Sequence, residues 1–185
     1  MAEMASLREA YGKALVRAGS KNPNIVALDA DLGKSTFSRS IMELGPERFV
    51  EVGIAEQNMA AVSAGMAVAG KIPFFSSFAV FSTGRAYDQI RSSICIPKFN
   101  VNLCGSSAGL SDYGDGKTHQ SLDDIAIMQV LPNMTVLAPV DANQVFGMVD
   151  AMAAHDGPCY IRIPRNPLPV ITKLEPYTIG QVDIF

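Results

Sequence analysis

The sequence predicts an α/β protein with a doubly wound, mostly parallel sheet of about six strands and helices on both faces. Short apolar runs alternate with segments of helical spacing along nearly the whole chain, which is typical of strands joined by helical crossovers. These runs are apolar throughout, as expected for strands that are covered on both faces. With 185 residues, 48% of them hydrophobic and 18% charged, the chain suits one well-buried domain of ordinary size.

The first half of the chain predicts three strands and three helices. Residues 6–18 place their apolar side chains on one helical face, and Gly19 supplies a stop signal. A polar loop over residues 29–36 follows the first strand. The predicted elements are, in order, helix 6–18, strand 25–28, helix 37–44, strand 49–52, helix 55–69 and strand 72–76.

The second half continues the alternation around one long irregular loop. Residues 105–120 are rich in glycine and serine and predict that loop. Asp141 and Gln144 resemble a capping box that starts the last long helix. The predicted elements are, in order, helix 85–94, strand 100–104, helix 122–130, strand 135–138, helix 141–154 and strand 159–163.

The composition changes after Arg165. Residues 1–166 form one domain in this interpretation, whereas residues 167–185 are rich in proline and threonine and lack helical periodicity. We expect this tail to be a connector toward a C-terminal domain that is absent from the sequence.

Charge and cysteine use narrow the class of protein. The net charge is −3 and basic clusters are absent, so we expect no nucleic-acid partner. The longest apolar stretch, residues 59–69, is too short to span a membrane, and the N-terminus lacks a signal-peptide core. Cys95, Cys104 and Cys159 are widely spaced and read as reduced core thiols, which favours the cytoplasm.

Glu56 is the strongest single candidate for chemistry. It lies in residues 49–58, where an apolar strand gives way to a helix of small residues. Ligands of open α/β sheets bind beyond the carboxyl ends of the strands, so a carboxylate at this point is placed for chemistry. The alternative is an ordinary acidic residue at a helix N-terminus, where it favours the exposed amides.

His119 is the second candidate, because histidine transfers protons or binds an oxyanion near neutral pH. It lies at the end of the long polar loop, where a solvated histidine without a role is the alternative. His155 follows a helix and suits a favourable cation at a helix C-terminus. We assign His155 no catalytic role.

Aromatic and basic residues supply further candidates. Phe78 and Phe81 follow the strand over residues 72–76 and can stack on a flat heterocycle, whereas Phe74 and Phe75 lie in that strand and suit the core. Candidates for anion binding, each of which is alternatively a surface residue, are Arg8, Ser35 and Arg165.

Two patterns carry less weight. Gly114-Asp115-Gly116 with Asn143 has the spacing of a diphosphate-metal motif, but no strand directly precedes it, so we do not assign a metal site. The helix over residues 55–69 is rich in alanine and glycine. It packs either against another subunit or within the core of its own domain.

The combined pattern resembles the pyrimidine-binding domain of transketolases. The order and spacing of the matching segments fit nearly the whole chain. These segments are Asp29-Ala30-Asp31-Leu32, Gly53-Ile54-Ala55-Glu56-Gln57-Asn58, Ser77-Phe78-Ala79-Val80-Phe81, Asp115-Gly116-Lys117-Thr118-His119-Gln120 and Ile163-Pro164-Arg165. The resemblance implies the thiamine diphosphate-binding fold in its pyrimidine-type form.

The resemblance also implies roles for individual residues. Glu56 is expected to hydrogen-bond N1′ of the aminopyrimidine of thiamine diphosphate, which lets the cofactor act as its own base. Phe78 and Phe81 are expected to stack on the pyrimidine, and Asp31 matches a family acid near the cofactor. On the substrate side, the family's contacts to the ketose oxygen, a sugar hydroxyl and the sugar phosphate correspond to His119, to Asp115, and to Arg8, Ser35 and Arg165.

A complete transketolase also contains a diphosphate-binding domain and a smaller C-terminal domain, and neither fits in 185 residues. The resemblance therefore implies a split enzyme or a truncated piece of a longer chain. A partner diphosphate-binding domain would share the thiamine diphosphate and hold Mg²⁺, through an interface like that of the family's homodimers. The chain alone is expected to be inactive, and its substrates would be sugar phosphates.

Alternatives remain at this point. Residues 85–89 are similar to a run in 1-deoxy-D-xylulose-5-phosphate synthase, which uses the same cofactor with pyruvate as donor. The β subunit of a 2-oxo acid dehydrogenase is disfavoured by Asp115 and His119. A non-catalytic dimerisation module of the same fold is an alternative of a different class.

Overall fold

The computed structural model describes residues 3–181 and consists of one six-stranded parallel sheet between two layers of helices. Its strand order is β3-β2-β4-β5-β7-β6, and every neighbouring pair is parallel. The strands are β2 (Ile25–Asp29), β3 (Phe49–Glu51), β4 (Ile72–Phe78), β5 (Asn102–Ser106), β6 (Thr135–Leu137) and β7 (Cys159–Arg162). The predicted doubly wound α/β fold is confirmed.

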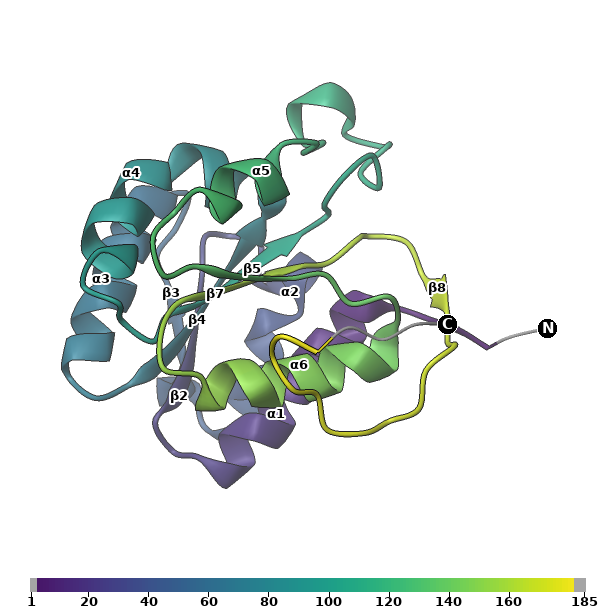
Figure 1. The fold of residues 1–185 in the computed structure, drawn as a ribbon, viewed down its shortest axis with the longest axis horizontal. Helices are drawn as coiled ribbons and strands as arrows, with labels where there is room; N and C mark the ends of the chain where they lie inside the picture. The colour runs from purple at the N-terminus through teal and green to yellow at the C-terminus, as the bar shows by residue number, and fades with distance from the viewer. Residues whose placement is uncertain (1–2, 182–185) are drawn as a thin grey trace.

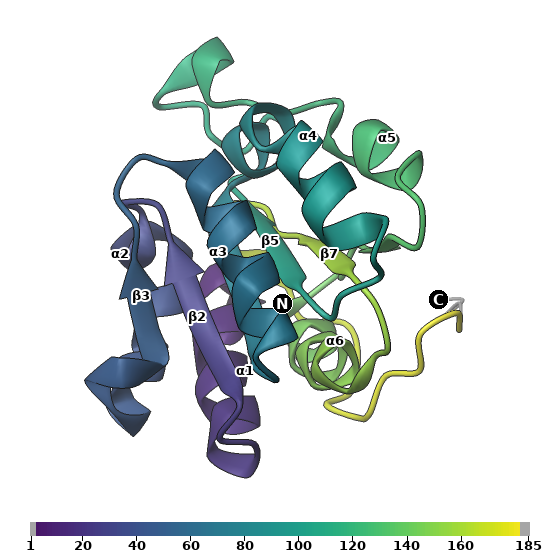
Figure 2. The same cartoon turned by 90° about the vertical axis from the view of Figure 1, so that its left-hand side faces the viewer.

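Helices cover both faces of this sheet (Figures 1 and 2). Helices α1 and α6 pack on one face, and α3, α4 and α5 lie on the other. Their bounds are α1 (Leu7–Lys21), α2 (Gly33–Thr36), α3 (Glu56–Val68), α4 (Tyr87–Gln89), α5 (Asp124–Gln129) and α6 (Ala142–Ala154). Adjacent residues of one strand serve opposite cores, as Phe74 and Phe75 do, which explains why the strands are apolar throughout.

Two expected helices differ from the sequence prediction in type or length. The helix expected over residues 37–44 is a 3₁₀ helix, η1 (Ser38–Leu44), and it begins after Phe37 in a left-handed conformation. The helix expected over residues 85–94 is longer and contains two π-helical segments, η3 (Val80–Arg85) and η4 (Ile90–Cys95), on either side of α4. Two further 3₁₀ helices are η2 (Pro46–Arg48) and η5 (Gly116–Thr118).

Part of the expected connector packs on the domain. Strand β8 (Leu168–Pro169) pairs antiparallel with β1 (Met4–Ala5), a small second sheet that the sequence did not suggest. The N-cap residue Asp141 of α6 accepts hydrogen bonds from the backbone N–H groups of Ile171 and Thr172 at 2.8 and 2.7 Å. Residues 182–185 of the expected connector lie outside the described residues.

Helix α3 exposes one side and buries the other. Met59, Ala60, Ser63 and Ala64 are buried against the sheet layer, while Val68 is 69% exposed. Its small residues therefore serve its own core on one face, and the expected contact of the other face with a second subunit stays a prediction.

Candidate functional site

The candidate residues follow strands on both sides of a topological switch point. From β2 the chain adds β3 on one side and β4 on the other, and ligands of open α/β sheets bind beyond the carboxyl ends at such a point. The residues after β2 are Asp31 and Ser35, after β3 Glu56, at and after the end of β4 Phe78 and Phe81, and after β5 Asp115 and His119. Arg8 on α1 and Arg165 after β7 complete the set.

Glu56 is the first residue of α3 and is 1% exposed. A turn at Gly53, whose φ is +71°, brings the chain from β3 into this helix. The carboxylate accepts a hydrogen bond from Nη1 of Arg85 at 2.8 Å, and Oγ of Ser77 lies 3.5 Å from its other oxygen. Glu56 is thus a buried, ion-paired carboxylate and not an exposed acid at a helix end.

Arg85 connects Glu56 to the aromatic candidates. Its guanidinium carbon lies 4.8 Å from the centre of the Phe81 ring, close enough for a cation–π contact. Phe81 and Phe78 are nearly parallel, with ring centres 6.2 Å apart. The ring of His119 is steeply inclined to both, in a T-shaped arrangement, with its centre 5.3 Å from that of Phe81 and 6.0 Å from that of Phe78. Four of the nine sequence candidates would therefore share one cluster with Arg85, a residue not predicted for the site.

The anion-binding candidates form a second cluster. Arg8 donates from Nη1 to the backbone carbonyl of Ser35 at 2.9 Å, so this contact does not involve the Ser35 hydroxyl. The pKa of Arg8 is lowered, first by burial and then by the nearby positive charge of Arg165. Nη1 of Arg165 lies 3.6 Å from Oδ2 of Asp115. Two neighbouring guanidinium groups of like charge favour an anion between or beside them.

Asp112 pairs with the candidate Arg165 and was not predicted from the sequence. It is wholly buried, and both of its carboxylate oxygens lie 3.0 Å from Nη1 of Arg165. The backbone N–H of Arg165 also donates to Oγ of Ser111 at 2.9 Å. The loop after β5 thereby fixes the position of Arg165, which lies more than fifty residues further along the chain.

Asp31 lies in the loop after β2 and differs from the other candidates. It is exposed, has a φ of +63°, and donates from its backbone N–H to Oε1 of Glu51 at 2.8 Å. A hollow of about 420 Å³ beside it is also lined by Lys34 and Arg39. None of these contacts joins Asp31 to the cluster around Glu56 and Arg85, so its role near a cofactor stays a prediction.

Asp29 fixes the conformation of this loop through hydrogen bonds. It is wholly buried at the end of β2 and accepts hydrogen bonds from Oγ1 of Thr36, Oγ of Ser38 and the backbone N–H of Leu32. Burial raises the pKa of Asp29 from 3.8 to about 6, although these hydrogen bonds lower it in part. One buried carboxyl group therefore fixes the turn that carries Asp31 and Ser35.

Gly114-Asp115-Gly116 does not directly follow a strand, as it would in a diphosphate-metal motif. Gly114 and Asp115 lie in an irregular loop, and Asn143 lies on α6, where its side chain donates to the carbonyl of Thr172 at 2.8 Å. Among residues 3–181, no group of three or more potential metal-ligating side chains comes together.

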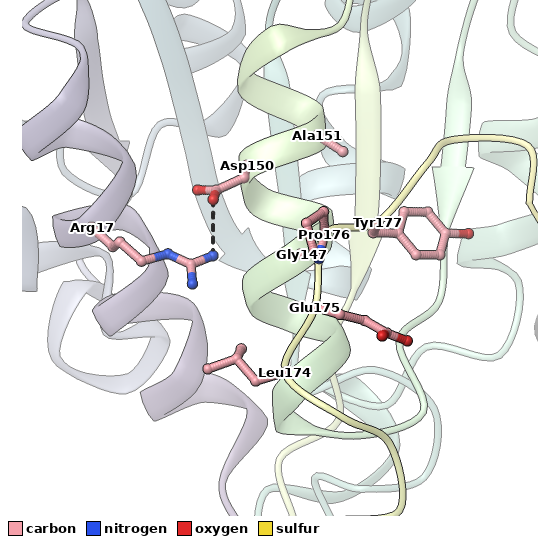
Figure 3. A pocket seen from close by; sticks show the side chains of 8 residues that line it. All are labelled: Arg17, Gly147, Asp150, Ala151, Leu174, Glu175, Pro176 and Tyr177. Carbon is pink, nitrogen blue, oxygen red and sulfur yellow. Dashed lines mark hydrogen bonds and ion pairs between the residues drawn. The ribbon is translucent and has the colours of Figure 1, made fainter.

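A separate hollow of about 360 Å³ lies between α1, α6 and residues 174–177 (Figure 3). Arg17 of α1 forms an ion pair with Asp150 of α6 at 3.0 Å there. None of the candidate residues lines this hollow.

Within residues 3–181, no helix combines the length and the apolar character that crossing a bilayer requires. The expectation of a cytoplasmic protein stays a prediction.

The fold and the site together define an α/β domain with a buried carboxylate and aromatic rings at the switch point of its sheet. The family model for the transketolase pyrimidine-binding domain matches residues 3–170. This chain belongs to that family.

Curated relatives agree with this assignment. A putative transketolase C-terminal section of Methanocaldococcus jannaschii is 43% identical over 169 residues, covering 91% of this chain and 54% of that protein. The 6-deoxy-6-sulfo-D-fructose transketolase subunit of a Clostridium species is 38% identical and is covered to 56%. Human transketolase is 40% identical over 179 residues and is covered to 28%. The chain therefore spans about half of the first two proteins.

A solved structure described as a split gene transketolase in an inactive β4 tetramer superimposes with a TM-score of 0.86 at 47% identity. The superposition covers 97% of this chain and 58% of that one. The transketolase of Campylobacter jejuni has a TM-score of 0.84 at 21% identity and supports the fold alone.

Proposed function

We propose that this chain is the pyrimidine-binding part of a transketolase-like transferase, which moves a two-carbon ketol unit between sugar phosphates with thiamine diphosphate. The observation that carries the proposal is the buried carboxylate of Glu56, which Arg85 connects to the ring of Phe81, with Phe78 and His119 packed on that ring. A carboxylate in so dry a setting binds a ring nitrogen more strongly than it would in water.

The residues of this cluster suit an aminopyrimidine. Arg85 presents a flat, hydrogen-bonding cation that meets Glu56 at 2.8 Å and the face of Phe81 at 4.8 Å. A flat nitrogen heterocycle can make the same two contacts, a hydrogen bond to Glu56 and a stacking contact with Phe81. These residues therefore fit the aminopyrimidine ring that the family uses.

In this proposal Glu56 hydrogen-bonds N1′ of the pyrimidine and holds a shared proton at that atom. Phe81, and beside it Phe78, provide the aromatic surface for the ring, and Asp31 lies near the cofactor. When bound, the cofactor supplies the nucleophilic carbon that accepts the two-carbon unit. The residues of this chain bind and orient it and exclude water from its ring.

On the substrate side, His119 contacts the ketose oxygen and Asp115 a sugar hydroxyl. Arg165, Arg8 and Ser35 bind the phosphate, and the lowered pKa of Arg8 reflects the burial and the crowding of positive charge that an anion relieves. Binding energy from a phosphate far from the reacting carbon then serves to orient the sugar.

The proposal requires a diphosphate-binding domain on a partner chain, which shares the thiamine diphosphate and holds Mg²⁺ at an interface like that of the family's homodimers. The 47% identical split-gene chain is described as an inactive β4 tetramer, and we expect this chain alone to be inactive too. Residues 167–181 and those after them would lead to a C-terminal domain.

The test is transfer activity of the subunit that carries this chain, reconstituted with a diphosphate-binding partner. We expect activity with a ketose phosphate donor and none with pyruvate, which is the donor of 1-deoxy-D-xylulose-5-phosphate synthase. The double substitution Glu56→Gln, His119→Ala should abolish transfer, whereas the exposed Lys117→Met should not change it. Undiminished transfer by the double variant would reject the proposed function.

A further inference from the structure

Arg85 makes the two contacts that the proposed function gives to the cofactor's pyrimidine. Its Nη1 donates to Oε2 of Glu56 at 2.8 Å, and its guanidinium carbon lies 4.8 Å from the centre of the Phe81 ring. We propose that Arg85 holds the place of the aminopyrimidine in the cofactor-free protein and must leave Glu56 before the ring can bind. This inference rests on the proposed function.

The exposure of the two side chains indicates which of them moves when the cofactor binds. The side chain of Glu56 is 1% exposed, whereas that of Arg85 is 45% exposed. Nη1 of Arg85 lies 2.8 Å from one oxygen of Glu56, whereas the hydroxyl of Ser77 lies 3.5 Å from the other, so Arg85 is the closer and the charged partner of this carboxylate. Arg85 is the half-exposed member of the pair, so it is the group that can turn out into solvent.

Arg85 lies in an unusual helical segment of the kind found at functional sites. Arg85 is the last residue of the π-helical segment η3 (Val80–Arg85), and π-helical turns are rare and concentrated at functional sites. Arg85 lies four residues after Phe81 on the same helical segment. Rotation about the side-chain bonds of Arg85 is therefore enough to break its contact with the Phe81 ring.

The exchange keeps a buried charge paired at every stage. A carboxylate as buried as that of Glu56 is costly without a partner, and Arg85 supplies one until the pyrimidine takes over. The same contact lowers the apparent affinity for the cofactor, because only molecules in which Arg85 has left Glu56 can bind the ring. Arg85 is thus a positioning residue that competes with the cofactor.

The experiment uses the complete subunit that carries this chain, assembled with its diphosphate-binding partner. Binding of thiamine diphosphate with Mg²⁺ is measured by calorimetry for the wild type, Arg85→Met and the exposed control Arg91→Met. We expect Arg85→Met to lower the dissociation constant about tenfold and to speed association, and Arg91→Met to match the wild type. Without cofactor, Arg85→Met should melt at a lower temperature than the wild type, and saturating cofactor should remove that difference.

The variant Glu56→Gln separates the two levels of the argument. If Glu56→Gln binds the cofactor as tightly as the wild type, or if the wild type does not bind, the proposed function fails and this inference with it. If binding depends on Glu56 but Arg85→Met leaves it unchanged or weaker, only the placeholder role is overturned. In the Glu56→Gln background, Arg85→Met should have no further effect on affinity, and a remaining effect would also overturn it.

Discussion

Nη1 of Arg165 lies 3.0 Å from both carboxylate oxygens of Asp112, a side chain that is wholly buried. Arg165 itself is partly exposed and lies 3.6 Å from Asp115, so one buried acid anchors a guanidinium that reaches the surface. The buried Asp112 fixes the direction in which the Arg165 side chain points, because a charge-assisted contact with a buried partner leaves a side chain little freedom. Asp112 and Asp115 both lie in the loop after β5.

Asp112→Asn should weaken substrate binding without disabling the chemistry. Asparagine keeps the volume but not the charge, so Arg165 loses its orientation toward the proposed phosphate position. We expect the KM for a phosphorylated donor to rise about tenfold while kcat changes by no more than about twofold. Steady-state kinetics of the reconstituted enzyme measures both, with the exposed Asp156→Asn as the matched control. An equal loss in kcat and kcat/KM would contradict this role for Asp112.

His119→Asn tests the aromatic cluster from the substrate side. His119 packs edge-on against Phe81 and Phe78, so asparagine removes a proton-transfer group and leaves a polar side chain of smaller size. We expect kcat/KM for the ketose donor to fall about 100-fold. The exposed neighbour Lys117→Met should leave kcat/KM unchanged, and a fall of the same size there would show that the loop matters and not the imidazole.

The pKa of Asp29 predicts an unusual pH dependence of stability. Burial raises that pKa from 3.8 to about 6 in the folded protein, so the folded state binds more protons than the unfolded state between these values. The contribution is fully present below pH 3.8 and is lost as the pH rises through about 6, a change of about 3 kcal/mol in the free energy of unfolding. At pH values above that range, the contribution of Asp29 to the free energy of unfolding no longer changes with pH.

Asp29→Asn checks this sign. The asparagine side chain resembles the protonated acid, and the hydroxyls of Thr36 and Ser38 can turn to accept hydrogen bonds from it. The variant should therefore be more stable than the wild type at pH 7, with the difference shrinking toward pH 4. Chemical denaturation at several pH values measures the difference, and Asp156→Asn serves as control. A difference that does not change between pH 4 and 7 would rule out the shifted pKa.

The sequence allowed the sheet and much of the candidate site to be predicted, because both depend on local patterns. Apolar runs between helical segments gave the six strands, and the strand-to-helix change at Glu56 marked the switch-point carboxylate. These features arise from periodicity and chain order. The two-residue strands β1 and β8 did not follow, because pairing across more than 160 residues leaves no local signal.

Arg85 and Asp112 were missed for different reasons. Arg85 lies four residues after Phe81, a spacing that places two side chains on one helical face, so a closer reading of that face could have found it. Asp112 is one of several polar residues in an irregular loop, and only the folded chain distinguishes its buried carboxylate from the exposed one of Asp115. The π-helical segments were equally invisible, because their residues resemble those of an ordinary helix.

Gly105→Ala should destabilise the fold strongly. A methyl group at Gly105 would overlap Oη of Tyr160 and lie 2.7 Å from the ring atoms beside it. Tyr160 donates to Oδ2 of the buried Asp124 at 2.8 Å, and Nε of Arg162 donates to the same oxygen at 2.9 Å. Displacing the ring breaks this buried network, at an expected cost of about 3 kcal/mol.

Gly65→Ala is the matched control for that substitution. Gly65 lies in helix α3, and apart from its chain neighbours and the backbone of that helix no atom lies within 4 Å of the position that a methyl group would take there. Alanine is the better helix former, so we expect a gain of up to about 1 kcal/mol. Thermal denaturation of both variants measures the contrast, and equal stability of the two would contradict the tight packing of Gly105 on Tyr160.

The carboxylate of Asp141 binds residues 171 and 172 to the start of α6. Its two oxygens accept hydrogen bonds from the backbone of Gln144, Ile171 and Thr172 and from the Thr172 hydroxyl, at 2.7 to 3.0 Å. Burial alone would raise the pKa of Asp141, but these four hydrogen bonds together lower it below its ordinary value. Their stabilisation is therefore present above the ordinary pKa and is lost as the pH falls through the lowered one.

The variant Asp141→Asn separates the helix cap from this clamp. Asparagine still caps α6 well, but its NH₂ group cannot accept the hydrogen bonds that the second carboxylate oxygen receives from Ile171 and Thr172. We expect the exposed Lys173 to be cleaved by trypsin at least about tenfold faster at pH 8, because about 1.5 kcal/mol of local stability is lost. The helix content measured by circular dichroism should not change. Cleavage at Lys173 at the wild-type rate would mean that other contacts, such as the β1–β8 pairing, hold this segment to the domain.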